Sequence, residues 1–149
     1  MTECLRVTRT RPAGPDHQVV TVEGGNAGSF RRRPCSTCPW RVDAVGVFPA
    51  EAFRHSANTA YDMAPNTFAC HQSGAERPAL CAGFLLRGAA HNMGARLGVI
   101  RGEVALDQVE AGSAALHPSY RAMAVANGVD PADPVLARCR DDAALDDDQ

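Results

Sequence analysis

Four cysteines in the middle of the chain have the spacing of a metal or redox site. Two residues separate Cys35 from Cys38, and Cys70 and Cys81 follow as a second group. Two thiolates spaced in this way can bind one ion, because the intervening turn brings their sulfurs together, and a second pair completes four-coordination. We therefore predict that these four cysteines are metal ligands. His71, directly after Cys70, could replace one cysteine as a ligand or be a surface residue, but we favour a hydrogen bond from it to a ligand sulfur.

The chemistry of the site is open between zinc, an iron–sulfur cluster and thiol redox reactions. Zinc takes tetrahedral sulfur and nitrogen ligands, but ten residues separate the second pair of cysteines instead of the usual two to four. An iron–sulfur cluster accepts more scattered cysteines, and a proline after a ligand, as in Cys38-Pro39, is a ferredoxin feature. We expect Trp40 and Phe68, beside the ligands, to shield such a cofactor from water. The sequence thus favours an iron–sulfur cluster over zinc.

The rest of the chain indicates a cytoplasmic protein with reduced thiols. No window contains 18 or more apolar residues, which is the length of a membrane-spanning helix. The first residues, MTECLRVTRTRPAG, lack the apolar segment of a secretory signal. In a reducing compartment, cysteine clusters indicate metal or redox sites rather than disulfides. We interpret Cys4 and Cys139, near the two ends, as thiols outside the site.

Standard catalytic motifs are missing from the sequence. It has no nucleophile elbow, phosphate-binding loop, zinc-protease helix motif or dinucleotide-binding fingerprint. Glu51 and His55 are four residues apart on a predicted helix and could form an acid–base pair. Such pairs are more often surface contacts, and the same holds for Arg87 and His91. We therefore favour a non-enzymatic role, with a cluster- or thiol-dependent redox enzyme as the alternative.

The charge distribution indicates one candidate surface for a partner. The net charge is −2 and the isoelectric point about 6.2, which excludes the global basic field of a non-specific nucleic-acid binder. The first 41 residues nevertheless carry seven arginines against three acidic residues. Arg31, Arg32 and Arg33 precede the first cysteine pair, and Trp40-Arg41 follows it. Because an aromatic beside arginine is a common interface anchor, we predict a regulatory or interaction module that contacts a protein or a nucleic-acid machine through this segment.

Short elements must position the cysteines. An alternating strand over 17–22, a turn at Gly24-Gly25-Asn26 and a short strand near 29–33 predict an N-terminal hairpin. Apolar spacing and start and stop residues predict helices over 49–58, 78–101 and 119–126. The longest of these contains four glycines, each costing up to about 1 kcal/mol relative to alanine. It therefore requires close packing, and it places Cys81 in its first turn.

Length and composition predict one small domain. At 15.8 kDa, with 5% aromatic residues, the chain has a thin core that a bound metal would supplement, since metal-binding free energy at such a site is folding free energy. Residues 1–16 are predicted to be a flexible basic arm, 17–140 a single metal-binding domain and 141–149 a disordered acidic tail. The predicted fold is α+β, with a short N-terminal hairpin, a metal-centred knuckle and two or three helices.

The strings PCSTCPWR, FACHQS and CAGF, in that order, resemble a family of small proteins of unknown function from actinobacteria and their phages. The resemblance covers residues 34–101 and brings no activity with it. The restriction of all 15 basic residues to arginine indicates a GC-rich genome and agrees with that origin. The WhiB-like iron–sulfur regulators offer an analogy only, because their cysteines follow a different order. The resemblance implies these signature positions: Cys35, Cys38, Trp40, Cys70, His71, Cys81 and Gly83.

Overall fold

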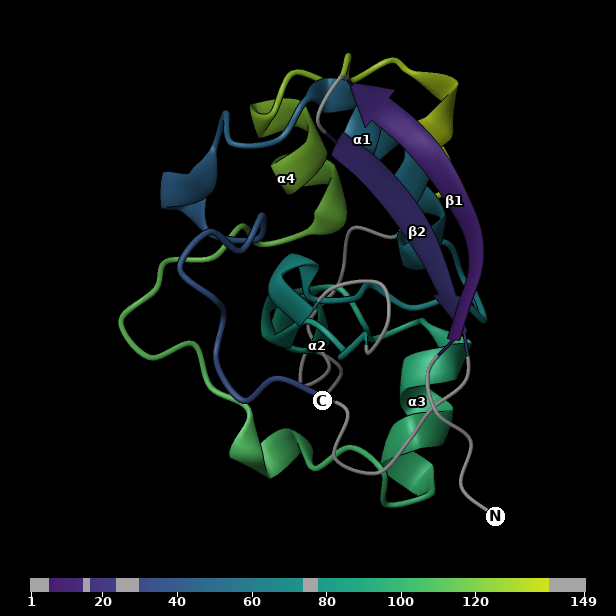
Figure 1. Cartoon of the computed structure of the whole chain (residues 1–149), viewed down its shortest axis with the longest axis vertical. Coiled ribbons are helices and arrows are strands. Elements are labelled where there is room, and N and C mark those ends of the chain that lie inside the picture. Colours follow the sequence, from purple (N-terminus) through teal and green to yellow (C-terminus); the bar gives the residue numbers. More distant parts are fainter. Residues whose placement is uncertain (1–5, 15–16, 24–29, 74–77, 140–149) are drawn as a thin grey trace.

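The computed structural model describes residues 6–14, 17–23, 30–73 and 78–139, which form a small α+β domain (Figure 1). Its antiparallel sheet pairs β1 (Arg6–Gly14) with β2 (His17–Glu23). The α-helices are α1 (Ala50–Ser56), α2 (Ala82–Arg87), α3 (Met93–Ile100) and α4 (Tyr120–Ala126). Five single 3₁₀ turns complete it: η1 (Val42–Ala44), η2 (Ala57–Ala60), η3 (His71–Ser73), η4 (Leu106–Gln108) and η5 (Pro134–Leu136). The predicted acidic tail over 141–149 lies outside the described residues.

The N-terminal hairpin exists, but its strands differ from those predicted. The strand expected over 17–22 is confirmed as β2, whereas its partner β1 occupies residues that we expected to form a flexible arm. The strand predicted near 29–33 is wrong for its described residues, where Phe30 forms only an isolated bridge. A two-stranded ladder needs only backbone partners, so β1 pairs without an alternating apolar pattern. The hairpin lies alongside α1 (Figure 1).

The long helix predicted over 78–101 is two helices. The first, α2, ends at Gly88, whose backbone (φ −124°, ψ 1°) leaves the helical region. The second, α3, begins after Asn92, whose side chain accepts a hydrogen bond from the Ala95 N–H at 2.8 Å. Asparagine is a favoured N-cap because its oxygen satisfies a free helical N–H. The apolar spacing continues across the break because both helices bury one face, and this continuity produced the wrong prediction.

Asn92 also joins α3 to η2 and to the loop that contains Asn66. Its side chain is almost fully buried and donates hydrogen bonds to the carbonyls of Thr59 at 3.0 Å and Asn66 at 2.7 Å. One amide thus satisfies two buried acceptors and one helix N-terminus. Buried polar groups are stable only when bonded in this way, so Asn92 is a structural residue.

The core is built around an aromatic cluster. Trp40 lies 5.9 Å from Phe68 and 5.9 Å from Tyr120, ring centre to ring centre, both in edge-to-face geometry. Phe68 in turn stacks on Phe84 of α2. The Tyr120 hydroxyl, at the start of α4, donates to the Phe53 carbonyl of α1 at 2.6 Å. These contacts fix three helices around the loop that contains Trp40. Within the described ranges, no helix is long and apolar enough to cross a membrane.

Replacing Asn92 should destabilise the fold strongly. We expect Asn92→Ala to lower the free energy of unfolding by about 2 to 4 kcal/mol, because it removes a helix cap and leaves two buried carbonyls without donors. Urea unfolding followed by circular dichroism measures the change. Arg96→Ala, at an exposed position of the same helix, is the control and should change stability by less than about 0.5 kcal/mol. Equal losses in the two variants would contradict this role of Asn92.

Candidate metal centre

A short ladder places Cys70 and Cys81 on one face. Ala69 and Leu80 form an antiparallel bridge, flanked by hydrogen bonds from the backbone N–H groups of Cys70 and Cys81 at 2.7 and 2.9 Å. Side chains alternate across a strand, so the residues that follow Ala69 and Leu80 both point to the opposite face. The ten-residue spacing between these cysteines, which argued against zinc, is therefore no obstacle to their convergence.

The loop with the other two cysteines is attached to the same ladder. Phe30 forms a parallel bridge with Leu80, and the Arg31 N–H donates to the Leu80 carbonyl at 2.9 Å. A further hydrogen bond of 3.1 Å, from the Cys38 N–H to the Cys35 carbonyl, closes the turn between the two cysteines. The backbone bonds at Phe30 and Arg31 thus fix the start of the loop that contains Cys35 and Cys38. This start lies beside Leu80, the residue that precedes Cys81.

All four predicted ligands come together. Cys38 Sγ lies 3.5 Å from Cys81 Sγ, and the Cys35 thiol contacts those of Cys38 and Cys70. The contacts link the sulfurs in the order Cys70, Cys35, Cys38, Cys81, and no disulfide joins these four cysteines. Within the part of the chain that the structure describes, no three or more His, Cys, Asp or Glu side chains have the arrangement of a preformed ion site. We call these four thiols the thiol group.

Three sulfurs of the thiol group also accept backbone hydrogen bonds in one repeated pattern. In each case the donor is the N–H two residues further along the chain. Hydrogen bonds to an ionised acceptor are about twice as strong as those to a neutral one, so this pattern stabilises the sulfurs as thiolates. The donor and acceptor pairs are Thr37 to Cys35, Trp40 to Cys38 and Gln72 to Cys70.

Without a cation, the surroundings of Cys35, Cys38 and Cys70 raise the pKa of each thiol. The contact with Cys35 lowers the pKa of Cys38, but the contact with Cys81 and burial outweigh it and raise that pKa to about 12. The contact with Cys35, followed by burial, raises the pKa of Cys70 above its usual range. The contact with Cys38 does the same for Cys35. A nucleophilic thiol needs a lowered pKa, so the thiol-oxidoreductase alternative loses support.

His71 holds the loop between the first two cysteines. Its Nε2 pairs with the Thr37 hydroxyl at 2.7 Å, and its ring packs edge-to-face on Phe48, 4.9 Å between ring centres. Burial lowers the pKa of His71, so the neutral ring is favoured. The next residue, Gln72, donates to the Ser36 hydroxyl at 3.4 Å. His71 Nε2 thus bonds a hydroxyl of the loop, whereas the sequence analysis favoured a hydrogen bond to a ligand sulfur and gave Ser36 and Thr37 no role.

The aromatic residues lie behind the thiol group. Trp40 has no exposed surface, so the prediction that it forms an exposed interface anchor with Arg41 is wrong. A Cβ on Gly83 would lie 2.5 Å from Trp40 Cβ and 3.2 Å from Cys38 Sγ, which makes glycine necessary at that point of α2. Phe68 is half-buried and packs on the Trp40 ring. Both aromatic residues therefore separate the thiol group from the rest of the core.

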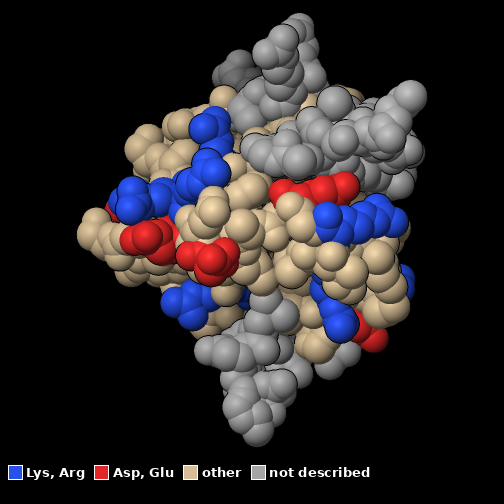
Figure 2. Space-filling model, turned by 90° about the horizontal axis from the view of Figure 1, so that it is seen from below, with Lys and Arg blue, Asp and Glu red and all other residues tan. Residues whose placement is uncertain are grey.

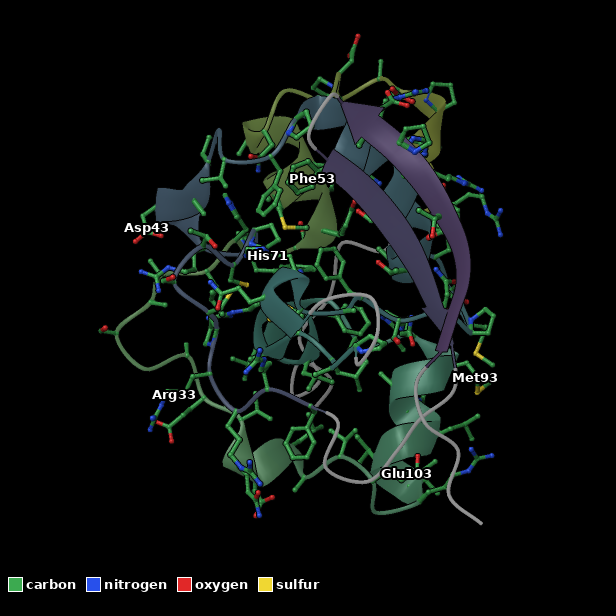
Figure 3. The ribbon with its side chains drawn as sticks, in the orientation of Figure 1. Arg33, Asp43, Phe53, His71, Met93 and Glu103 are labelled. Carbon is green, nitrogen blue, oxygen red and sulfur yellow. The ribbon has the colours of Figure 1, made fainter. Side chains whose placement is uncertain are left out.

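The arginine run lies on the surface next to the thiol group. Arg31, Arg32 and Arg33 are all exposed, and Figure 3 shows Arg33 extending outward on the same side of the molecule as Asp43, with His71 further in. Arg32 donates to Gln108 at 3.1 Å, and Arg33 pairs with Glu110 at 3.4 Å. The face seen in Figure 2 carries basic and acidic residues side by side. The charge on this face is therefore mixed.

The remaining candidates lie outside the thiol group. Cys139 is buried, and its sulfur contacts the Ala57 carbonyl at 3.6 Å. Glu51 and His55 pair at 3.2 Å on α1, and both are half-buried. Cys4 lies outside the described residues.

Comparison with known proteins gives a family and no solved relative. The model of a family described as "Family of unknown function (DUF6283)" matches residues 30–140. No curated protein and no solved structure matches the chain. The matched range begins after the β1–β2 hairpin and contains the whole thiol group.

A methyl group at Gly83 should disturb both Trp40 and Cys38. We expect Gly83→Ala to lower the free energy of unfolding by about 1 to 3 kcal/mol through overpacking, despite the better helix propensity of alanine. Gly98→Ala is the matched control, because the nearest atom there is a Val104 methyl at 3.1 Å that can shift. Urea unfolding of both variants tests this difference. If Gly83→Ala is as stable as Gly98→Ala, the close approach to Trp40 is not required.

Proposed function

The chain belongs to the DUF6283 family, whose function is unknown, and we propose that it is a metal-binding protein whose ion is held by Cys35, Cys38, Cys70 and Cys81. The observation that carries the proposal is the convergence of these thiols from three separate segments. Neutral thiols gain little from contacting one another, whereas a cation that replaces their protons gains four charged ligands. The backbone N–H groups aimed at three of the sulfurs support the same conclusion.

The distance between the Cys38 and Cys81 sulfurs favours a single ion over a four-iron cluster. Four sulfurs at about 2.3 Å from one zinc ion form a tetrahedron with edges of about 3.8 Å. The 3.5 Å between Cys38 Sγ and Cys81 Sγ is close to that edge. In a four-iron cluster with four cysteine ligands, each thiolate binds its own iron, which holds the sulfurs further apart than contact distance. We therefore propose zinc, although the sequence alone favoured an iron–sulfur cluster.

The ion would act first as a structural staple. It would join the loop of residues 35–38 to both strands of the ladder at Cys70 and Cys81, and so hold Trp40 in place behind them. Metal-binding free energy at such a site is folding free energy. A reducing cytoplasm would keep the four cysteines available to the ion.

Metal analysis tests the proposal directly. We expect the purified protein to be colourless and to contain about one zinc ion per chain, with chelation lowering the midpoint of thermal unfolding. Cys81→Ser should lose most of the zinc, while the control Cys139→Ser, at a buried thiol outside the thiol group, should keep it. A brown protein that contains iron and sulfide in equal amounts would show that the thiols hold an iron–sulfur cluster instead of zinc. A reduced, folded protein that contains and binds no metal would refute the proposal.

A second, compatible role is an interaction module. Exposed side chains flank the thiol group on the chain and give it a surface of both charged and apolar character. A metal-bound loop would present them in a fixed arrangement, which lowers the entropic cost of binding a partner. We propose that this surface contacts a protein or a nucleic acid. Its residues are Arg31, Arg32, Arg33, Val42, Val45 and Val47.

Alanine at all three arginines should weaken partner capture without changing metal content. The hydrogen bond of Arg32 and the ion pair of Arg33 are exposed, so the triple variant Arg31→Ala/Arg32→Ala/Arg33→Ala should stay folded. A pull-down with proteins and nucleic acids from the source organism measures capture, and zinc analysis of the same sample checks that the metal site is intact. The control Arg96→Ala/Arg101→Ala removes exposed arginines elsewhere. Unchanged capture by the triple variant would exclude this surface.

A further inference from the structure

The four thiols differ in their access to solvent. Cys38, Cys70 and Cys81 are at most 4% exposed, whereas Cys35 is half-buried. Cys35 is also the sulfur through which Cys70 is linked to the other two. A small oxidant that reaches the thiol group from solvent therefore meets Cys35 first, and Cys35 already contacts the thiols that would react with its oxidised form.

The order of the contacts allows one complete pairing. The sulfurs are linked as Cys70, Cys35, Cys38 and Cys81. Joining the two middle sulfurs would use both of the thiols that contact the outer ones. Joining each outer sulfur to its neighbour uses all four, as Cys35–Cys70 and Cys38–Cys81. Each of these bonds connects the loop to one strand of the ladder, so the fold keeps its covalent links at the site.

We propose that the thiol group is a reversible redox switch: a peroxide oxidises Cys35, disulfides form between Cys35 and Cys70 and between Cys38 and Cys81, and the ion is released. The proposal rests on the proposed function, since it describes the regulation of the same site. The Cys38 and Cys81 sulfurs need to approach only from 3.5 Å to a bond length of about 2.05 Å. Rotation of the two side chains, one in the loop and one in the ladder, would supply this movement.

The chemistry balances with hydrogen peroxide as the oxidant. In the zinc-loaded protein the ion keeps Cys35 as a thiolate, which attacks one peroxide oxygen; the O–O bond breaks, and a sulfenic acid and hydroxide form. The Cys70 thiolate then attacks the Cys35 sulfur and displaces hydroxide, which leaves as water after protonation. A second peroxide oxidises the Cys38 and Cys81 pair in the same way. Four thiolates, two peroxides and four protons thus give two disulfides, four water molecules and one free divalent ion, and a thiol reductant reverses the change.

Peroxide titration of the zinc-loaded full chain tests this switch. The protein carries Cys4→Ser, so that the N-terminal thiol does not contribute. A chelating dye measures released zinc, and alkylation followed by mass spectrometry identifies the bonds. Proteolysis after Glu76 separates Cys70 from Cys81, and peptide fragmentation distinguishes Cys35 from Cys38. We expect two peroxides consumed per zinc released, both disulfides in the product, and recovery of bound zinc after reduction.

Trapping with dimedone, which labels sulfenic acids, identifies the first cysteine to react, and it requires no substitution in the thiol group. We expect the label at Cys35. Cys139→Ser is the matched control and should leave the rate of zinc release unchanged. A Cys35–Cys38 disulfide as the main product, or a first label on a buried cysteine, would overturn the switch while zinc binding stands. A chain that holds no zinc but forms both disulfides would instead overturn the proposed function. The part of the switch in which the ion is released would then be wrong as well.

Discussion

Trp40 is the side chain on which the arrangement of the site depends. It has no exposed surface, and the backbone of α2 comes so close that a Cβ at Gly83 or Gly88 would lie 2.5 or 2.4 Å from it. Only glycine permits this approach. The ring thereby fixes the loop of residues 35–41 against α2, and Cys38 and Cys81 follow from that contact, since one precedes Trp40 by two residues and the other caps α2.

The site combines this rigid support with groups suited to a cation. The ladder holds Cys70 and Cys81, the turn holds Cys35 and Cys38, and His71 connects the two parts through Thr37. Backbone N–H groups already point at three sulfurs, so little reorganisation is needed when protons give way to an ion. The same closeness of the sulfurs allows an ion to bind or disulfides to form, which is why structure and redox regulation can share one site.

Local sequence signals predicted the elements whose formation depends on local interactions. The helix expected over 49–58 is α1 with η2, and the short helix expected over 119–126 is α4. The division between α2 and α3 could not be predicted, because it depends on Trp40 against Gly88 and on the buried bonds of Asn92 with distant carbonyls. The spacing of apolar residues indicates only which face of a helix is buried, and it does not show where the helix is interrupted.

The sequence by itself determined the chemistry that is available: four cysteines in two groups, a histidine beside one of them, an α+β fold and the lack of a standard catalytic motif. The tertiary structure decided how these residues meet. It buried Trp40, which the sequence placed at an interface, and brought Cys70 and Cys81 to one face of a ladder despite the ten residues between them. The physical reason is that sulfur-to-sulfur distances and burial depend on contacts between distant segments, whereas residue types and short spacings are properties of the chain alone.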